Sequence, residues 1–208
     1  MPSDPQLPDQ QRSGQQLSGK PVSGKPVLDT MVPVALQFRL ARLDDVAAIV
    51  ALVESAYRGD AAREGWTTEA DLIGGQRTDA GAVADALAQP EVVIVLGELD
   101  GEVVACAQLT GRPHAAEFGM FAVRPRQQGG GLGGALLAEA EATVRGRWSS
   151  PIMEMLVIAQ RTELIDWYGR RGYRPTGQTR PFPYGNARYG LPNRPDLSFV
   201  VLSKTLDG

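Results

Sequence analysis

The chain has 208 residues, of which 43% are hydrophobic and 22% charged, and its formal net charge is −3 at pH 7. This length predicts one domain with a tail, and the near-neutral charge argues against nucleic acid as a partner. A single cysteine and a single histidine exclude a disulfide framework and cysteine- or histidine-rich metal sites. No apolar run is long enough to span a membrane and no signal-peptide pattern opens the chain, so we expect a cytoplasmic protein that uses no metal and no membrane.

Residues 1–33 are expected to form a disordered leader, and residues 34–208 a single folded domain. The leader is mostly Gln, Ser, Gly, Pro and Asp, and it repeats Ser-Gly-Lys-Pro-Val in tandem over residues 18–27. Such a segment has too few large apolar side chains to offset the entropy lost on ordering it. Met31 is an alternative start of the protein, and the sequence alone leaves that choice open.

The domain alternates between strand and helix patterns. The predicted elements of the first half are a strand over 36–41, a helix over 44–57, a loop over 59–66, a broken helix over 68–87, and strands over 92–99 and 102–109. Those of the second half are a strand over 117–123, a helix ending near 147, a strand over 152–158, a helix over 162–171, a strand beginning at 173, a loop over 180–195 and a strand over 197–206. Asp100-Gly101 is a two-residue hairpin turn. The order predicts an α/β (α+β) fold, a mixed sheet with helices on both faces.

The most informative segment is the glycine-rich turn at residues 128–134, Gln-Gly-Gly-Gly-Leu-Gly-Gly, which lies between a predicted strand and an amphipathic helix. Backbone N–H groups at the start of a helix have no partner within the helix, and together with the helix dipole they bind anions. Glycines let a phosphate approach the backbone closely. The turn therefore predicts a phosphorylated ligand that is held mainly by main chain.

The glycine-rich turn has three other interpretations: a Walker A loop, a dinucleotide-binding fingerprint, and a flexible connection that binds no ligand. A Walker A loop is excluded, because the turn contains no lysine. A dinucleotide-binding fingerprint is formally present in Gly129, Gly131 and Gly134, with Glu154 about 20 residues further on. However, the turn lies in the middle of the chain, and residues 125–128 separate its glycines from the strand. A flexible connection without a ligand is the remaining alternative, although so many glycines disfavour a helix start.

Two motifs resemble those of the GNAT superfamily of N-acetyltransferases. Residues 128–133 match its signature, Gln/Arg-x-x-Gly-x-Gly/Ala, and residues 168–173 are similar to its second one, a Tyr, three residues, then Gly and an aromatic residue. The resemblance covers nearly all of the folded part and implies a mostly antiparallel central sheet of about seven strands. The chain departs from the family at Arg161 and Leu164, where many relatives carry Asn and Ala.

The resemblance implies a transferase, an acyltransferase that moves an acetyl group from acetyl-CoA to a primary amine by direct attack. The acceptor would be a small molecule or, as second choice, a peptide or protein amine, and the enzyme a monomer or homodimer. A non-catalytic acyl-CoA-binding sensor or interaction module is the alternative. Acetyl-CoA would place its pyrophosphate on the turn and its pantetheine arm along the preceding strand. The cofactor-binding residues expected on this basis are Phe121, Ala122, Val123, Gln128, Gly129, Gly130, Gly131, Leu132, Gly133 and Gly134.

Acyl transfer to an amine needs a neutral amine and a proton for the leaving thiolate. Tyr168 is the expected acid, because it matches the tyrosine of the family motif; the alternative is a core tyrosine. Glu117 is the expected base, since it lies six residues before Val123, where some relatives place a catalytic glutamate; an exposed surface charge is the alternative. His114 is a rival base in a predicted loop. Cys106 could carry the acyl group, but we expect it to be a small buried hydrophobic residue.

Two segments, residues 57–69 and 180–189, are rich enough in aromatic residues to form the acceptor pocket. Within them the expected substrate-binding residues are Tyr57, Trp66, Glu69, Phe182 and Tyr184. Packing of these side chains onto the core is the alternative. Four arginines near the tyrosine motif could contact the 3′-phosphate of the coenzyme, although a solvated helix face is our expectation for them: Arg161, Arg170, Arg171 and Arg174.

Overall fold

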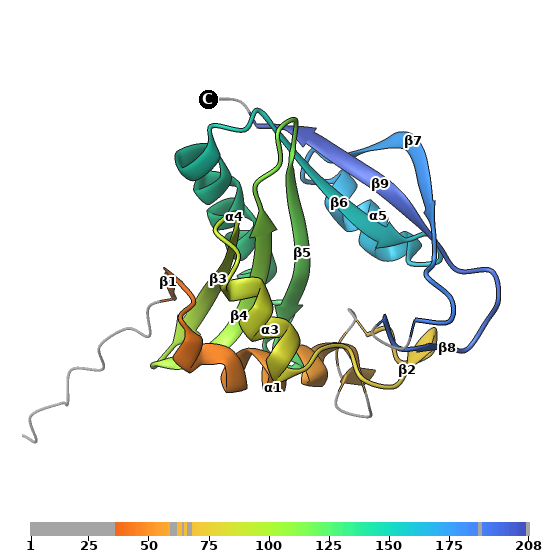
Figure 1. The fold of residues 1–208 in the computed structure, drawn as a ribbon, viewed down its shortest axis with the longest axis horizontal. Coiled ribbons are helices and arrows are strands. Elements are labelled where there is room, and N and C mark those ends of the chain that lie inside the picture. The colour runs from red at the N-terminus through yellow and green to blue at the C-terminus, as the bar shows by residue number, and fades with distance from the viewer. Residues whose placement is uncertain (1–35, 59–61, 64, 66–67, 187–188, 207–208) are drawn as a thin grey trace, which may run out of the picture. The chain divides into compact units, whose positions relative to one another are not determined.

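The computed structural model describes residues 36–58, 62–63, 65, 68–186 and 189–206. The predicted leader and Trp66 lie outside these residues. The described chain contains a central sheet whose strands are β1 (Gln37–Leu40), β3 (Val92–Leu99), β4 (Glu102–Thr110), β5 (Ala116–Val123), β6 (Ile152–Ile158), β7 (Arg174–Pro181) and β9 (Ser198–Thr205). The seven strands follow the order β1-β3-β4-β5-β6-β9-β7 (Figure 1).

All neighbouring strands of this sheet are antiparallel except β5 and β6, which run parallel. The predicted hairpin joins β3 to β4, and both residues of its turn have left-handed backbones, with φ of 53° at Asp100 and 77° at Gly101. That geometry matches the right-handed twist of the paired strands. The predicted fold class, a mixed and mostly antiparallel sheet of about seven strands, is confirmed.

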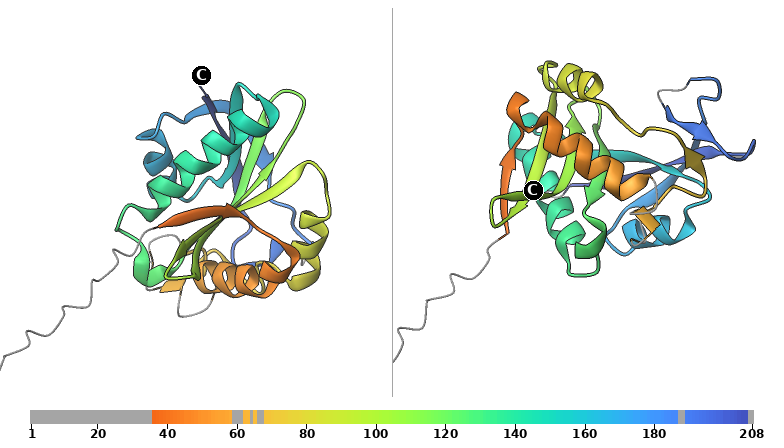
Figure 2. Two further views of the ribbon diagram at one scale, coloured as in Figure 1. Left: turned by 90° about the vertical axis from the view of Figure 1, so that its left-hand side faces the viewer. Right: turned by 90° about the horizontal axis from the view of Figure 1, so that it is seen from below.

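Helices cover both faces of the sheet (Figure 2). One face carries α1 (Val46–Tyr57) and α3 (Ala80–Leu87), and the other carries α4 (Leu132–Trp148) and α5 (Thr162–Gly169). Strand β3, which has a neighbour on each side, shows why. Val93 and Val95 belong to the core on the side of α4 and α5, while Ile94 and Leu96 belong to the core on the side of α1. Because successive side chains of a strand point to opposite faces, an unbroken apolar run needs a cover on each.

The segment predicted as a broken helix over 68–87 is helical only in α3. Ala80 begins the helix because the side chain of Asp79 accepts a hydrogen bond from the backbone N–H of Ala82, 2.8 Å away. Gly81 therefore lies inside a capped first turn and does not break the helix. Upstream, β2 (Ile73–Gly74) pairs with β8 (Leu191–Pro192) in a separate two-stranded sheet. This long-range pairing has no local signature.

The loop predicted over residues 180–195 begins later than expected. The edge strand β7 runs to Pro181 and pairs with β9 as far as Ser198. Pro181 is tolerated there because it is the last residue of an edge strand. No further strand lies on the outer side of β7, so the missing N–H of the proline interrupts no hydrogen bonds there. β8 then interrupts the loop, so the segment after β7 is tied to the residues that follow α1.

A buried ion triad joins α4 to the last strands. The Glu141 carboxylate accepts hydrogen bonds from the Lys204 ammonium at 2.7 and 2.8 Å and from the Tyr173 hydroxyl at 3.0 Å. Burial and the neighbouring carboxylate raise the pKa of Tyr173 well above its usual value of 10, so the hydroxyl stays a donor. The triad satisfies a charge that would be costly to bury alone.

Replacing Lys204 by Met is expected to lower the free energy of unfolding by roughly 2–4 kcal/mol, because the Glu141 carboxylate loses its ion-pair partner inside the protein. Urea unfolding at pH 7 measures the change. Asp196→Asn is the control, since it breaks an exposed ion pair with Arg194 and should leave the midpoint where it is. Equal midpoints for both variants would contradict a stabilising role of the triad.

Candidate active site

The site begins where β5 and β6 part. The two strands pair only over Ala116–Phe118 and Met153–Met155, and beyond them they separate (Figure 1). On its other side β5 carries a bulge, because Met120 and Phe121 together lie opposite the single residue Ala107 of β4. Met120 has a left-handed backbone with φ of 44°, which is unusual for a residue with a long side chain. The bulge and the separation open the sheet at Phe121.

One cavity of about 250 Å³ lies at the glycine turn. α4 begins directly after Gly131, whose φ of 86° places it in the left-handed region, and Gly129 has φ of 87°. The N–H groups of the first turn of α4 are free of helical partners, as expected for an anion site. A Cβ on Gly133 would lie 3.2 Å from the Phe121 ring, so a side chain there would fill the cavity. The turn can therefore hold a diphosphate closely.

Two residues that the sequence analysis did not assign to this cavity complete it. The guanidinium of Arg171 lies 3.5 Å from the centre of the Trp167 ring, and its Nη1 donates to the Trp167 carbonyl oxygen at 3.0 Å. Both side chains line the cavity. Trp167 lies in the last turn of α5 and Arg171 just beyond the end of the helix. Their spacing of four residues was the available signal, because it stacks an arginine on an aromatic ring and places a positive charge beside the glycine turn.

The expected cofactor residues divide into two groups. Those whose side chains or Cα atoms line the cavity are Phe121, Val123, Gln128, Gly129, Gly131, Gly133 and Gly134. The side chains of Ala122 and Leu132 instead pack into the two cores, on opposite faces of the sheet. Gly130 does not line the cavity either. For these three residues only the main chain can face a ligand.

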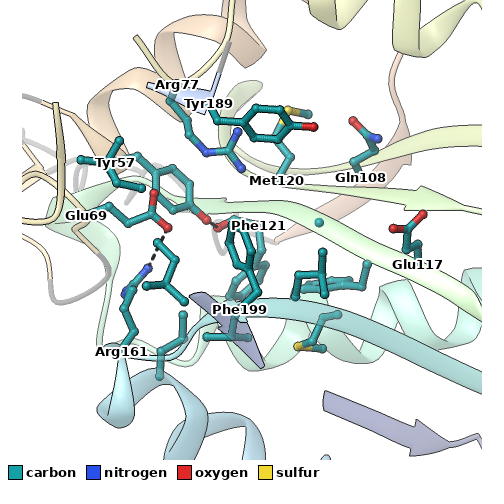
Figure 3. A pocket seen from close by; sticks show the side chains of 18 of the residues that line it. Tyr57, Glu69, Arg77, Gln108, Glu117, Met120, Phe121, Arg161, Tyr189 and Phe199 are labelled. Atoms are coloured by element: carbon teal, nitrogen blue, oxygen red, sulfur yellow. Dashed lines mark hydrogen bonds and ion pairs between the residues drawn. The ribbon is translucent and has the colours of Figure 1, made fainter. Parts of the chain in front are cut away.

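A second cavity of about 310 Å³ adjoins the first at Phe121, which lines both. Residues of β5 and of the C-terminal half of β6, where the two strands are no longer paired, line one side of this cavity. Figure 3 shows the lining residues, which come from several segments far apart in the sequence. The lining residues that can hydrogen-bond are Tyr57, Arg58, Glu69, Arg77, Gln108, Thr110, Arg112, Glu117, Arg161, Tyr168 and Tyr189.

Tyr168 is buried beside the larger cavity, which it lines. Its ring contacts those of Phe121 and Trp167, with centroids 6.2 and 5.0 Å away, and that of Phe118 in an edge-on arrangement at 6.3 Å. Burial raises the pKa of Tyr168 well above its usual value of 10. The predicted acid thus sits in the core and also lines the larger cavity, as a neutral hydroxyl with a proton to donate.

Glu117 lies on β5 at the rim of the same cavity. Its side chain is 48% exposed and forms an ion pair with Arg112, with a distance of 3.0 Å between Nη2 and Oε2. The rival base His114 is exposed and does not line either cavity. The thiol of Cys106 is buried, which raises its pKa to about 12, and it donates to the Met120 carbonyl oxygen. This thiol is therefore protonated and shielded.

The predicted acceptor residues are only partly brought together. Tyr57 and Phe182 line the larger cavity, and the Tyr57 hydroxyl donates to the Phe121 carbonyl oxygen. Tyr184 does not line it: its hydroxyl accepts from the Leu197 N–H at 2.6 Å and so secures the loop. Burial and the charge of Glu69 raise the pKa of Tyr57 to about 12, against the effect of two nearby arginines.

Glu69 lies between two buried arginines. Its Oε2 is 3.2 Å from Nη1 of Arg58 and its Oε1 is 3.4 Å from Nη1 of Arg161 (Figure 3 marks the second pair). Arg161 is thus not on a solvated helix face, whereas Arg170 and Arg174 are exposed. No local pattern places Arg58 and Arg77 in the cavity, because the segments around them are held there by the long-range pairing of β2 with β8.

Among the described residues, no cluster of three or more His, Cys, Asp or Glu side chains could hold a metal ion. None of the described helices is long and apolar enough to cross a membrane. The site therefore consists of a glycine turn suited to a diphosphate, an adjoining cavity of small-molecule size, and a buried tyrosine that lines this second cavity.

Comparison with known proteins agrees with this arrangement. The family model described as Acetyltransferase (GNAT) family matches residues 48–173. No curated protein matches the chain. Among solved structures, the ribosomal-protein-S18-alanine N-acetyltransferase of Escherichia coli is similar, with 16% identity, a TM-score of 0.62, and coverage of 84% of this chain and 96% of that one.

Two further structures are alike in fold. The ribosomal-protein-alanine N-acetyltransferase of Brucella melitensis has 22% identity and a TM-score of 0.62, covering 82% of this chain and 100% of that one. The protein yncA of Salmonella typhimurium, solved with its cofactor acetyl-CoA, has 21% identity and a TM-score of 0.61, covering 84% and 95%. The similarity to these solved structures is a similarity of fold. The family model, in contrast, matches residues 48–173, which are more than half of the chain. This protein therefore belongs to the acetyltransferase (GNAT) family.

Proposed function

We propose that this acetyltransferase moves the acetyl group of acetyl-CoA to the primary amine of a small molecule, and that the amine attacks the thioester directly. The observation that carries the proposal is the meeting of two cavities at Phe121, one at the glycine turn and one lined by Tyr168 and Glu117. A volume of about 310 Å³ suits a small organic acceptor better than a folded protein surface.

The glycine turn and α5 would hold the coenzyme. The N–H groups at the start of α4 would bind the diphosphate, and Arg171 adds a positive charge beside the same cavity. The main chain of Phe121–Val123 lies where β5 has lost β6 as a partner. The carbonyl oxygens of Phe121 and Val123 accept hydrogen bonds from the side chains of Tyr57 and Gln128, so the N–H groups of this stretch are the ones that would meet the pantetheine arm and the thioester carbonyl. Acetyl-CoA supplies the acetyl group as an activated thioester.

Direct attack needs only groups that the larger cavity offers. The amine nitrogen bonds to the acetyl carbon, the bond from that carbon to sulfur breaks, and the electron pair leaves with the sulfur. Glu117 accepts the proton that the amine loses, directly or through water, and Tyr168 donates a hydrogen bond and a proton to the departing thiolate. A covalent route through Cys106 is disfavoured, because its thiol is buried and its pKa is about 12.

A panel of primary amines tests the proposal. The purified protein is incubated with acetyl-CoA and with amino acids, simple alkylamines or short peptides, and released CoA is measured with a thiol reagent, which buried Cys106 should not consume. We expect CoA release that depends on a small amine. Tight binding of acetyl-CoA in calorimetry, with no release for any amine, would instead favour a non-catalytic acyl-CoA-binding module.

Replacing Gly133 by Val is expected to weaken coenzyme A binding by roughly 10-fold or more, because the new methyl groups crowd Phe121 and fill the cavity at the turn. Isothermal titration measures the affinity. Gly146→Ala is the matched control in the same helix, since nothing lies within 4 Å of its Cβ position. Unchanged affinity in the Gly133 variant, with an unchanged melting temperature, would place the coenzyme elsewhere.

Replacing Tyr168 by Phe is expected to lower kcat by about 100-fold, since the aromatic packing remains and only the donor is lost. The KM for acetyl-CoA should change little. Because burial raises the pKa of Tyr168 above 10, the hydroxyl stays protonated, and the wild-type rate should show no decline from this group up to pH 10. A kcat equal to that of the wild type would leave Tyr168 as a core residue only.

Glu117→Gln separates the two proton transfers. This variant should lose rate at pH 7, where the amine needs a base, and recover as the pH rises and more of the amine is neutral in solution. The Tyr168 variant should show no such recovery. A Glu117 variant with an unaltered pH profile would mean that the carboxylate only pairs with Arg112.

A further inference from the structure

The larger cavity holds more positive than negative charge. Among the described residues that line it, four are arginines, Arg58, Arg77, Arg112 and Arg161, and two are glutamates, Glu69 and Glu117. Glu117 pairs with Arg112 at the exposed rim. Of the remaining three arginines, Arg58 and Arg161 share the one carboxylate of Glu69, which leaves an excess of two positive charges away from the rim.

Part of this excess is deeply buried. The side chains of Arg58 and Arg161 are only 6% and 8% exposed, and both contact Glu69, which is 12% exposed. Nε and Nη2 of Arg58 are buried without a hydrogen-bond partner among the described residues. A guanidinium has five N–H donors, and buried donors without a partner are rare and unfavourable. The cluster therefore has unused donors as well as unbalanced charge.

Arg77 adds a third guanidinium to this end of the cavity. Its guanidinium lies 5.4 Å from the centre of the Tyr57 ring, and no described carboxylate forms an ion pair with it. Figure 3 shows Arg77 and Arg161 on the side of the cavity that holds Glu69, with Gln108 and Glu117 on the opposite side. The charges of Glu69, Arg77 and Arg161 all act on the hydroxyl of Tyr57. This hydroxyl donates a hydrogen bond to the Phe121 carbonyl oxygen.

We propose that the acceptor amine also carries a carboxylate, and that Arg77, Arg58 and Arg161 bind this carboxylate at the end of the cavity that holds Glu69. Arginine is suited to the task, since its planar fork donates two parallel hydrogen bonds to a carboxylate. The inference rests on the proposed acetyl transfer and names the class of its substrate, a small amino acid or a related amino-carboxylate.

The same positive charge has an effect on the amine. A nearby cation disfavours the ammonium form, so an amine bound beside these arginines has a lowered pKa and is more often neutral, as attack requires. A carboxylate offsets the repulsion when an amino acid enters the cavity, but a polyamine brings only further positive charge. The cavity therefore selects for amino-carboxylates and against polycationic acceptors.

Amino acids compared with their own carboxamides test this directly. Each pair has the same side chain and amine and differs in the carboxylate alone. The amine of the carboxamide is less basic, so a larger fraction of it is neutral at pH 8. In the absence of a carboxylate site the carboxamide should therefore react faster than the acid, and a preference for the acid must come from the protein. We expect at least one acid to be acetylated with a kcat/KM at least 10-fold above that of its amide, and to bind more tightly to the protein loaded with coenzyme A.

Arg77→Gln should raise the KM of that acid by roughly 10- to 100-fold, the usual range for a lost charge-assisted hydrogen bond, and should change the amide little. Arg77→Lys, which keeps the charge, should recover part of the loss. The control is Arg180→Gln on the edge strand β7, which removes one positive charge and does not line the cavity. Melting curves identify any variant that has failed to fold.

The outcomes separate this inference from the proposed function. If amides or simple amines are acetylated as well as the acids, the acetyltransferase activity stands and the carboxylate site is wrong. The titration of acids into the coenzyme-loaded protein decides the question without turnover. If no acid binds more tightly than its amide, or if Arg77→Gln leaves that difference intact, the inference is overturned even when the glycine turn binds acetyl-CoA.

Discussion

The site depends on the failure of β5 and β6 to stay paired. Their parallel ladder ends at Phe118 and Met155, and the bulge at Met120 turns β5 away on its other side. A continuous ladder would place the main chain of β6 against Phe121 and close both cavities. Because the strands part instead, a stretch of main chain inside a buried sheet is left open to a ligand. The cores above and below the sheet hold the strands in this open arrangement.

The two cavities that meet at Phe121 attract negative charge by different means. The glycine turn relies on backbone N–H groups and on the start of α4, which suits a diphosphate lying close to the main chain. The larger cavity relies on guanidinium groups, two of them buried. Tyr57 and Tyr168 line the larger cavity, and burial raises the pKa values of both, so both hydroxyls stay protonated at neutral pH.

Several features were predictable because they depend on residues close together in the chain. The Asp100-Gly101 turn, the apolar run of β3 and the glycines before α4 each determine a local backbone geometry or a pattern of burial. The predictions failed where a distant partner decides the structure. Residues 73–74 become a strand only because residues 191–192 pair with them, and Tyr184 bonds to the backbone of Leu197 instead of facing the acceptor cavity.

From the order of residues alone one can read the family, the central sheet, the glycine turn and the tyrosine motif, since each is a short pattern tied to backbone geometry. Nothing in that order reveals that Arg58, Arg77 and Arg161 line one cavity, or that Glu69 pairs with the first and the last of them. Those residues follow α1, precede α3 and precede α5, and only packing brings them together. Electrostatic interactions depend on distance and burial, which are properties of the folded chain, and so the charge of the acceptor cavity is decided there.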